Sequence, residues 1–283
     1  MNYCENIQKS LDFIEQHLKD DIDINTVVRQ SGYSTTHFYR IFQALIGETV
    51  KDYIRKRRLS EAAIDILISD NRIIDIAFEY CFNSQEVFTR AFAQIFGITP
   101  GRYRERTKQV VLYEKVNTCK KAQLNLQQAP FIDQIIVLNR EFSVVGIKET
   151  VQPGSSVIQS LWTEFALRKA EIEYALNPCK LLGLCEYMPE LTDESQFCYV
   201  AGIEVSSLNN IPRGMFSKNI PRSKYAVFTH KGPLSRLKTA YDYIYGAWLP
   251  YSGYEVAELD TIEAYDIASG SHDLNFQIYI PIK

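Results

Sequence analysis

One segment of the chain recurs fifty residues further along. Residues 34–47 are STTHFYRIFQALIG and residues 84–97 are SQEVFTRAFAQIFG, so a serine, two phenylalanines, an arginine and a glycine return at matching positions. In each copy the apolar residues are spaced i, i+3, i+4, i+7, which puts them on one face of a helix. Each copy needs its own core, so the repeat predicts an all-α domain made of two similar halves.

The repeated helices carry residues typical of helix ends. Ser34 and Ser84 lie where an N-cap side chain would accept a hydrogen bond from a backbone N–H of the first turn. Gly47 and Gly97 lie at the other end, where a left-handed residue closes a helix. We therefore expect each helix to span about one copy of the repeat.

A shorter amphipathic stretch and a tight turn precede each copy. Residues 24–30 come before the first copy and residues 73–80 before the second, which gives the helix-turn-helix pattern of DNA-binding proteins. Gly32 suits the first turn, whereas Cys81 holds the matching place in the second. Cys81 must adopt a left-handed backbone there, or the second turn has a different shape.

The stretch between the two copies, residues 49–69, has the pattern of one long amphipathic helix. At 1.5 Å per residue such a helix is about 30 Å long. Consecutive major grooves on one side of B-DNA are about 34 Å apart. The sequence therefore predicts a spacer that holds two recognition helices at roughly the separation of adjacent grooves.

Charge is distributed unevenly over this domain, although the whole chain has a net charge of −3. Residues 40–58 carry six basic and two acidic side chains, and residues 90–108 carry five basic and one acidic. The segments 1–39 and 59–89 are acidic. Two basic stripes on an acidic surface favour contact with phosphate, and two charged faces in solvent are the alternative.

Several protein classes are excluded at this stage. Six cysteines and four histidines show no close pairs of the kind that bind zinc, so we expect reduced thiols and no metal or cofactor. No apolar run approaches the roughly 20 residues of a membrane span. The N-terminus has no apolar signal-peptide core, so we expect a cytoplasmic protein without a membrane partner.

Residues 7–106 resemble the DNA-binding domain of the AraC/XylS family of bacterial transcription regulators. The resemblance rests on the paired helix-turn-helix units and on the ending FAQIFGITPGRYR (Phe92–Arg104), which contains the Ile-Thr-Pro and Tyr-Arg elements of the family. It implies that double-stranded DNA is a partner.

The same resemblance implies which side chains meet DNA. Arg40 is the expected guanine contact, because a guanidinium group fits guanine O6 and N7. A surface side chain without a partner is the alternative at each position. The implied base contacts are Thr36, Tyr39 and Arg40 in the first copy and Gln85, Glu86, Thr89 and Arg90 in the second, and the expected phosphate contacts are Lys51, Arg55, Arg57 and Arg104.

The pattern changes to strand-like runs from about residue 131, so we expect domains at 1–108 and 131–283 with a linker at 109–130. The pattern of residues 131–283 predicts two β-α-β-β units. The first has strands at 134–148, 180–188 and 196–206, and a helix at 155–176 after a turn at Pro153–Gly154; the second has strands at 223–231, 255–266 and 274–282, and a helix at 233–249 after Gly232–Pro233. This is an α+β arrangement with two helices on one face of antiparallel sheets and a groove between them.

The second domain resembles the GyrI-like effector-binding domain of multidrug-sensing regulators. The matching stretches are Ile220–Leu234, Trp248–Glu255, Ile262–Asp266 and Phe276–Ile282. The resemblance implies a cationic or amphipathic ligand in an aromatic pocket with a central carboxylate. Glu263 holds the matching place, and Glu186, at the parallel position in the first half, is the reserve candidate. The expected wall residues are Trp162, Tyr187, Tyr199, Phe228, Trp248 and Tyr265. An ordinary core or strand-surface position is the alternative for each.

The expected function is a transcription activator that binds a small-molecule effector and alters RNA polymerase recruitment, not an enzyme. One alternative is a hydrolase in which Glu263 acts with Tyr187 or Tyr265 as base and proton donor. Another is an architectural DNA binder whose second domain docks a partner protein. A C-terminal groove filled by its own side chains would favour this last alternative.

Overall fold

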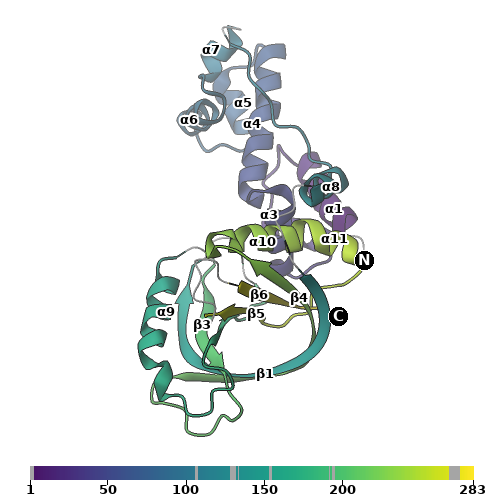
Figure 1. The fold of residues 1–283 in the computed structure, drawn as a ribbon. Coiled ribbons are helices and arrows are strands. Elements are labelled where there is room, and N and C mark those ends of the chain that lie inside the picture. The colour runs from purple at the N-terminus through teal and green to yellow at the C-terminus, as the bar shows by residue number, and fades with distance from the viewer. Residues whose placement is uncertain are drawn as a thin grey trace. The chain divides into compact units, whose positions relative to one another are not determined.

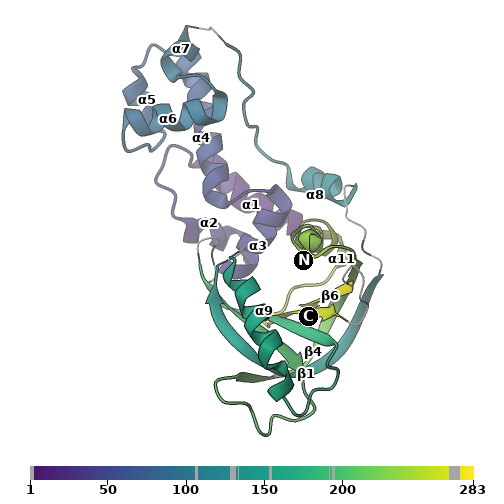
Figure 2. The same cartoon turned by 60° about the vertical axis from the view of Figure 1, so that its left-hand side comes forward.

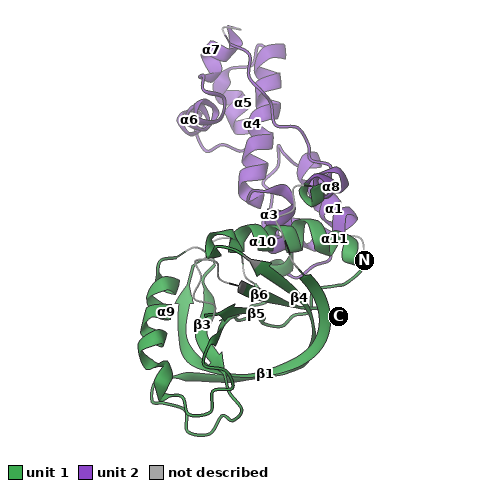
Figure 3. Ribbon diagram, in the orientation of Figure 1, with its two compact units in different colours: residues 1, 35–37, 125–283 green, residues 2–34, 38–124 purple. Residues whose placement is uncertain are grey.

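The computed structural model describes residues 3–105, 108–127, 132, 134–152, 155–190, 192, 195–267 and 275–283. Contacts divide the chain into two compact units, residues 2–34 with 38–124 and residues 1, 35–37 with 125–283 (Figure 3). We call these the helical unit and the barrel unit and describe each by itself. The expected turn at Pro153–Gly154 lies outside the described residues.

The N-terminal region is all-α, as the repeat predicted (Figure 1). Helices α2 and α3 form the first helix-turn-helix, α5 and α6 form the second, and α4 joins them. The helices are α1 (Tyr3–Gln16), α2 (Ile24–Ser31), α3 (Thr35–Ile46), α4 (Val50–Ile68), α5 (Ile73–Glu79), α6 (Gln85–Phe96), α7 (Pro100–Arg104) and α8 (Thr118–Gln127).

The ends of the repeated helices follow the sequence with one exception. Ser84 accepts a hydrogen bond from Val87 N at 3.2 Å, whereas the Ser34 side chain makes no capping bond, so that part of the prediction is wrong. Gly47 and Gly97 are left-handed, with φ 93° and 66°. Cys81 is left-handed too, with φ 60°, so the second turn keeps its shape at the cost of local strain.

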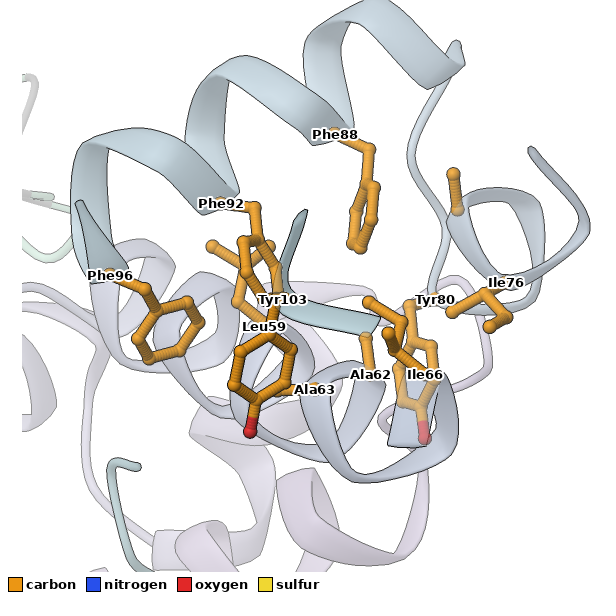
Figure 4. Close-up of a cluster of buried hydrophobic side chains, with 11 residues drawn as sticks. Leu59, Ala62, Ala63, Ile66, Ile76, Tyr80, Phe88, Phe92, Phe96 and Tyr103 are labelled. Atoms are coloured by element: carbon orange, nitrogen blue, oxygen red, sulfur yellow. The ribbon is translucent and has the colours of Figure 1, made fainter. Parts of the chain in front are cut away.

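Helix α4 belongs to the cores of both halves. Towards the first copy, the Tyr53 ring meets Phe42 edge-on at 6.0 Å. Towards the second copy, Leu59, Ala62 and Ile66 pack under the phenylalanines of α6 (Figure 4). With 19 residues α4 is about 28 Å long. It is therefore one continuous helix of about the predicted length, and its role as a spacer between adjacent grooves stays a prediction.

The chain that follows α7 is held against the helical unit. Tyr113 N donates to Ser60 Oγ at 3.0 Å, and Arg57 donates to the Tyr113 carbonyl. The chain then forms α8, whose first residue, Thr118, donates its hydroxyl to the Cys4 carbonyl at 2.7 Å. The described part of the expected linker is thus docked along α4 and α1.

The barrel unit is α+β, with two successive β-α-β-β halves, as predicted (Figures 1 and 2). The halves do not form separate sheets, however. All neighbours are antiparallel, and the strands close into one barrel in the order β1-β3-β2-β5-β6-β4. Closure is possible because the long β1 pairs with β3 over its second half and with β4 over most of its length. The strands are β1 (Gln134–Val151), β2 (Lys180–Cys185), β3 (Phe197–Glu204), β4 (Phe216–Lys231), β5 (Thr261–Asp266) and β6 (Asn275–Pro281).

The helices of this unit differ from the expected ranges. The first, α9 (Val157–Arg168), ends early because the chain turns back at the buried Ile172. The second is segmented into a 3-10 turn (Leu234–Arg236), α10 (Leu237–Tyr243), a π-helical turn (Ile244–Trp248) and α11 (Leu249–Ser252). No helix among the described residues is long and apolar enough to cross a membrane.

Alternation along the strands produces two faces. One set of buried residues, including Leu184, Val200 and Ile262, comes from all six strands and therefore fills the barrel interior. The other set, including Tyr199 and Ala201, packs with Leu161 and Phe165 of α9 on the outside of the barrel wall (Figure 2). Glu263 lies between Ile262 and Ala264 of the interior set, so its side chain points to the outer, helix-covered face.

Candidate DNA-contacting helices and ligand site

Helix α6 presents a polar, accessible face. Gln85, Glu86 and Arg90 are exposed and Thr89 is half-buried, while Phe88 on the opposite side is fully buried. A hydrogen bond from the Ser84 side chain holds the pKa of Glu86 below its usual range. Because recognition helices contact bases through their N-terminal residues, α6 has the shape and chemistry of such a helix.

The expected base contacts of the first copy, Thr36, Tyr39 and Arg40, lie in the first two turns of α3. This is the end of a recognition helix that contacts bases. All seven base contacts stay predictions.

The four expected phosphate contacts separate into two groups. Lys51 and Arg55 are exposed on α4. Arg57 is instead 7% exposed and donates to Glu15 at 2.9 Å and Glu61 at 2.6 Å. Arg104 donates to the carbonyls of Ile66 and Asn71 at the end of α4.

Arg57 and Arg104 therefore stabilise the helical unit through contacts within it, which the charge pattern did not reveal. Arg57 is a correction to the sequence analysis, because its guanidinium group lies inside an ion-pair network and not on the surface. A helix pattern shows which side of a helix is apolar, but it does not show that a basic residue on the border pairs with a carboxylate of α1.

In the barrel unit, Glu263 is the centre of a tyrosine cluster. It is 4% exposed. Tyr199 and Tyr265 donate to its Oε2 atom at 3.0 and 2.5 Å, and Tyr241 of α10 donates to Oε1 at 2.7 Å. Trp162 of α9 meets the Tyr265 ring edge-on at 5.6 Å. The carboxyl group thus lies among aromatic rings contributed by strands and by both helices.

Gly183 makes this cluster possible. In β2 it pairs with Glu263 of β5 on one side and Ala201 of β3 on the other. A Cβ atom on Gly183 would collide with the Tyr199 hydroxyl and lie 3.0 Å from Glu263 Oε2. The missing side chain lets Tyr199 reach across β2 to the carboxylate.

Burial and the neighbouring carboxylate keep the three tyrosines of the cluster protonated. Burial, and then the negative charge of Glu263, raises the pKa of Tyr199, Tyr241 and Tyr265 well above the usual range of tyrosine. The three hydroxyls therefore keep their protons and act as donors at neutral pH. Neutral donors stabilise a carboxylate without cancelling its charge.

Two further expected wall residues lie on the same face. The register places Phe228 two strands from Glu263, because Glu263 pairs with Ile278 and Ile278 with Phe228. Phe228 meets Trp248 edge-on at 4.9 Å. These two rings extend the aromatic surface beyond the tyrosine cluster.

Glu186 and Tyr187 are not brought to Glu263. Glu186 follows Leu184 in alternation and is paired with Lys148 and Lys218. Burial opposes its ionisation, but hydrogen bonds from these lysines hold the pKa of Glu186 below its usual range. Tyr187 N donates to Asp260 at 2.8 Å. The reserve role of Glu186 is therefore a correction, because a residue on the interior face of β2 cannot reach the outer face.

Two cluster members were not predicted as site residues. Neither Tyr241 nor Gly183 is among the expected pocket residues. A tyrosine within the amphipathic helix expected at 233–249 was a usable signal for Tyr241, whereas Gly183 depends on a strand register that the sequence did not supply. Among the described residues, no group of three or more His, Cys, Asp or Glu could hold a metal ion.

Two family models match this chain. Residues 134–283 match the GyrI-like small molecule binding domain, and residues 27–106 match a helix-turn-helix domain. The first match covers more than half of the chain, and both resemblances found in the sequence are thereby confirmed.

Individual relatives match either one part or the whole. The uncharacterized HTH-type transcriptional regulator YbfP of Bacillus subtilis is 46% identical over 109 residues, which are 38% of this chain and 37% of YbfP. The transcriptional regulator Rob of Salmonella typhimurium is 25% identical over 293 residues, which cover 98% of both chains. The structure of SAV2435 bound to tetraphenylphosphonium is 18% identical with a TM-score of 0.44, and the match covers 53% of this chain and 94% of that one.

Proposed function

This chain belongs to the family of proteins with a GyrI-like small molecule binding domain, and we propose that it is a DNA-binding transcription activator controlled by a lipophilic cation bound at Glu263. The proposal that the ligand is a lipophilic cation rests on one observation: Glu263 is a buried carboxylate that accepts hydrogen bonds from three tyrosine hydroxyls and lies among aromatic rings. Aromatic rings attract cations and bury apolar area, and the carboxylate supplies the counter-charge.

The helical unit supports the DNA half of the proposal. It has two helix-turn-helix motifs on either side of one rigid helix, and exposed basic residues on α4 and α6. The relatives Rob and YbfP are named transcriptional regulators. We propose that the protein acts in the cytoplasm by altering RNA polymerase recruitment at promoters to which α3 and α6 bind.

The ligand site is closed by its own side chains in this structure. The Tyr241 hydroxyl donates a hydrogen bond to Oε1 of Glu263, and the carboxylate is almost fully buried. A cation must therefore displace the Tyr241 hydroxyl before it can approach the charge. The affinity is highest for ligands whose charge and ring contacts exceed the loss of that hydrogen bond.

Isothermal titration calorimetry with the full-length protein tests the ligand class. The probes are tetraphenylphosphonium and the neutral triphenylphosphine oxide, which share phenyl groups and differ in charge. Glu263→Gln should weaken binding of the cation about tenfold or more, because a hydrogen bond or contact to a charged group is worth about 1.5–3 kcal/mol. Binding of the neutral compound should change little.

A matched control is Glu258→Gln, which removes an exposed carboxylate from the same unit. It should leave both affinities unchanged. If Glu263→Gln weakened the binding of both compounds by the same factor, the glutamate would shape the pocket without acting as a counter-charge. Neither probe has a bond that a hydrolase would cleave, so the hydrolase is tested separately with a chromogenic ester such as p-nitrophenyl acetate; hydrolysis that Glu263→Gln abolishes would favour a hydrolase.

The closed site also favours a second candidate function, an architectural DNA binder whose barrel unit docks a partner protein. The same titration separates the two candidates, because a docking module binds neither probe. DNase footprinting at low ionic strength tests the helical unit independently. Protection of two adjacent major grooves is expected, and protection of one groove would reject the paired arrangement.

A further inference from the structure

Two cysteines that are 115 positions apart in sequence meet in the helical unit. Cys4 lies on the buried face of α1, one turn before the fully buried Ile7. Cys119 lies in the first turn of α8 and is exposed. Burial, and then the neighbouring Cys119 thiol, raises the pKa of Cys4, so the two thiols are close neighbours. The backbones are held together beside them, because the Thr118 hydroxyl donates to the Cys4 carbonyl at 2.7 Å and Thr118 N donates to Gln8 Oε1 at 3.0 Å.

We propose that Cys4 and Cys119 are a modification site, at which a low-molecular-weight disulfide such as oxidised glutathione forms a reversible disulfide bond between α1 and α8. The exposed Cys119 thiolate attacks the small disulfide, forms a mixed disulfide and releases one thiolate. The Cys4 thiolate then attacks the Cys119 sulfur and expels the second. The two cysteines lose two electrons and two protons, and the small disulfide is reduced to two thiols.

The environments of the two thiols fix this order of steps. Cys119 is accessible to the small disulfide, whereas Cys4 is 3% exposed. Burial raises the pKa of the Cys4 thiol to about 12, so little of it is thiolate at neutral pH. Cys4 therefore resolves the mixed disulfide and does not initiate exchange, and the second step is the slow one.

The bond would close a loop from residue 4 to residue 119, within which both helix-turn-helix motifs lie. Cross-links stabilise mainly by restricting the unfolded chain, and long loops gain most. The bond would also fix α8 on α1, at the point from which the chain continues into the barrel unit. A chemical signal at Cys119 would thereby restrict the connection that any ligand response must use.

The test incubates the native full-length protein with oxidised glutathione and counts free thiols after denaturation. The wild-type protein should lose two thiols, and tryptic mass spectrometry should find MNYCENIQK joined to the peptide that contains Asn117–Lys120. The midpoint of thermal unfolding of the helical unit should rise by about 5 °C or more, and dithiothreitol should reverse this rise.

Two serine variants complete the test. Cys119→Ser should abolish both the linked peptide and the rise, whereas Cys179→Ser removes an exposed thiol of the barrel unit and should preserve both. The proposal is overturned if Cys119 stops at the mixed disulfide with glutathione. It is also overturned if Cys4 pairs with another cysteine, or if the link forms only in protein unfolded with guanidinium chloride.

Discussion

Gly183→Ala should disrupt the tyrosine cluster with little change elsewhere. The new Cβ atom would occupy the place of the Tyr199 hydroxyl and lie 3.0 Å from Glu263 Oε2, so Tyr199 must leave its hydrogen bond. Loss of a buried hydrogen bond to a charged acceptor costs about 1.5–3 kcal/mol, and overpacking costs about 1–3 kcal/mol more. We therefore expect the free energy of unfolding of the barrel unit to fall by about 2.5–6 kcal/mol.

Tryptophan fluorescence during urea denaturation measures this change selectively. The protein has two tryptophans, Trp162 and Trp248, and both belong to the barrel unit. Trp162 also reports on the cluster itself, because its ring lies edge-on to Tyr199 and Tyr265. The midpoint of unfolding should move to a lower urea concentration, while the slope of the unfolding free energy against urea concentration stays unchanged.

A double-mutant cycle gives the result that would refute the reasoning. Tyr199→Phe removes the oxygen that suffers the closest contact, so Gly183→Ala should cost less in that background than in the wild type. The interaction energy should be about 1 kcal/mol or more. Additive effects within about 0.5 kcal/mol would show that Gly183 is needed for another reason, such as strand pairing with Ala201.

Three other changes test separate parts of the structure. Tyr241→Phe should raise the affinity for tetraphenylphosphonium, because it removes the hydroxyl that the cation must displace; a lower affinity would make Tyr241 a ligand contact. The tyrosines of the Glu263 cluster should keep their protons as pH rises, so the barrel unit should lose stability above about pH 10, where unfolded tyrosine ionises, and absorbance at 295 nm should show them titrating only on unfolding. Arg57→Ala should lower the stability of the helical unit by about 3 kcal/mol without changing the salt dependence of DNA binding, whereas Lys51→Ala should reduce the salt slope by about 1 and leave stability unchanged; the reverse pattern would restore Arg57 as a phosphate contact.

The helical unit could be predicted well from the sequence because the signals that define its helices are local. Helix periodicity and terminal glycines act within about four residues, and the fifty-residue repeat shows the same local pattern twice; together they predict the bounds of α3, α4 and α6 closely. Even the unusual left-handed Cys81 followed from its alignment with Gly32. What sequence did not supply was the pairing of distant groups, such as Arg57 with Glu15 of α1.

The barrel unit was harder to predict because its arrangement depends on strand register. The order of strands and helices was recoverable from composition, but closure needs β1 to pair with both β3 and β4. Moving a strand by one residue exchanges its two faces. Glu186 was the reserve candidate because it holds the parallel position in the first half, and the observed alternation puts it on the side of the interior residue Leu184, where Lys148 and Lys218 pair with it.

The register also explains why a carboxylate can persist at Glu263. A charge on the interior face of β5 would lie among Ile262, Ala264 and their apolar neighbours, where burial would force it to neutralise. On the outer face it meets hydroxyls from β3, β5 and α10, which hydrogen-bond its carboxyl group. On the interior side, Glu186 is held instead by ion pairs with Lys148 and Lys218. The two carboxyl groups thus depend on different partners, hydroxyls outside the barrel and lysines inside it. Tyr265→Phe removes one of the three hydrogen bonds to Glu263, so it should change the affinity for tetraphenylphosphonium and also lower the free energy of unfolding by about 1.5–3 kcal/mol. Trimming an interior residue, as in Leu184→Ala, should lower the free energy of unfolding by about 2–5 kcal/mol without a matching change in affinity. Urea denaturation and calorimetry on the two variants check both expectations, and a loss of affinity in Leu184→Ala as large as in Tyr265→Phe would contradict them.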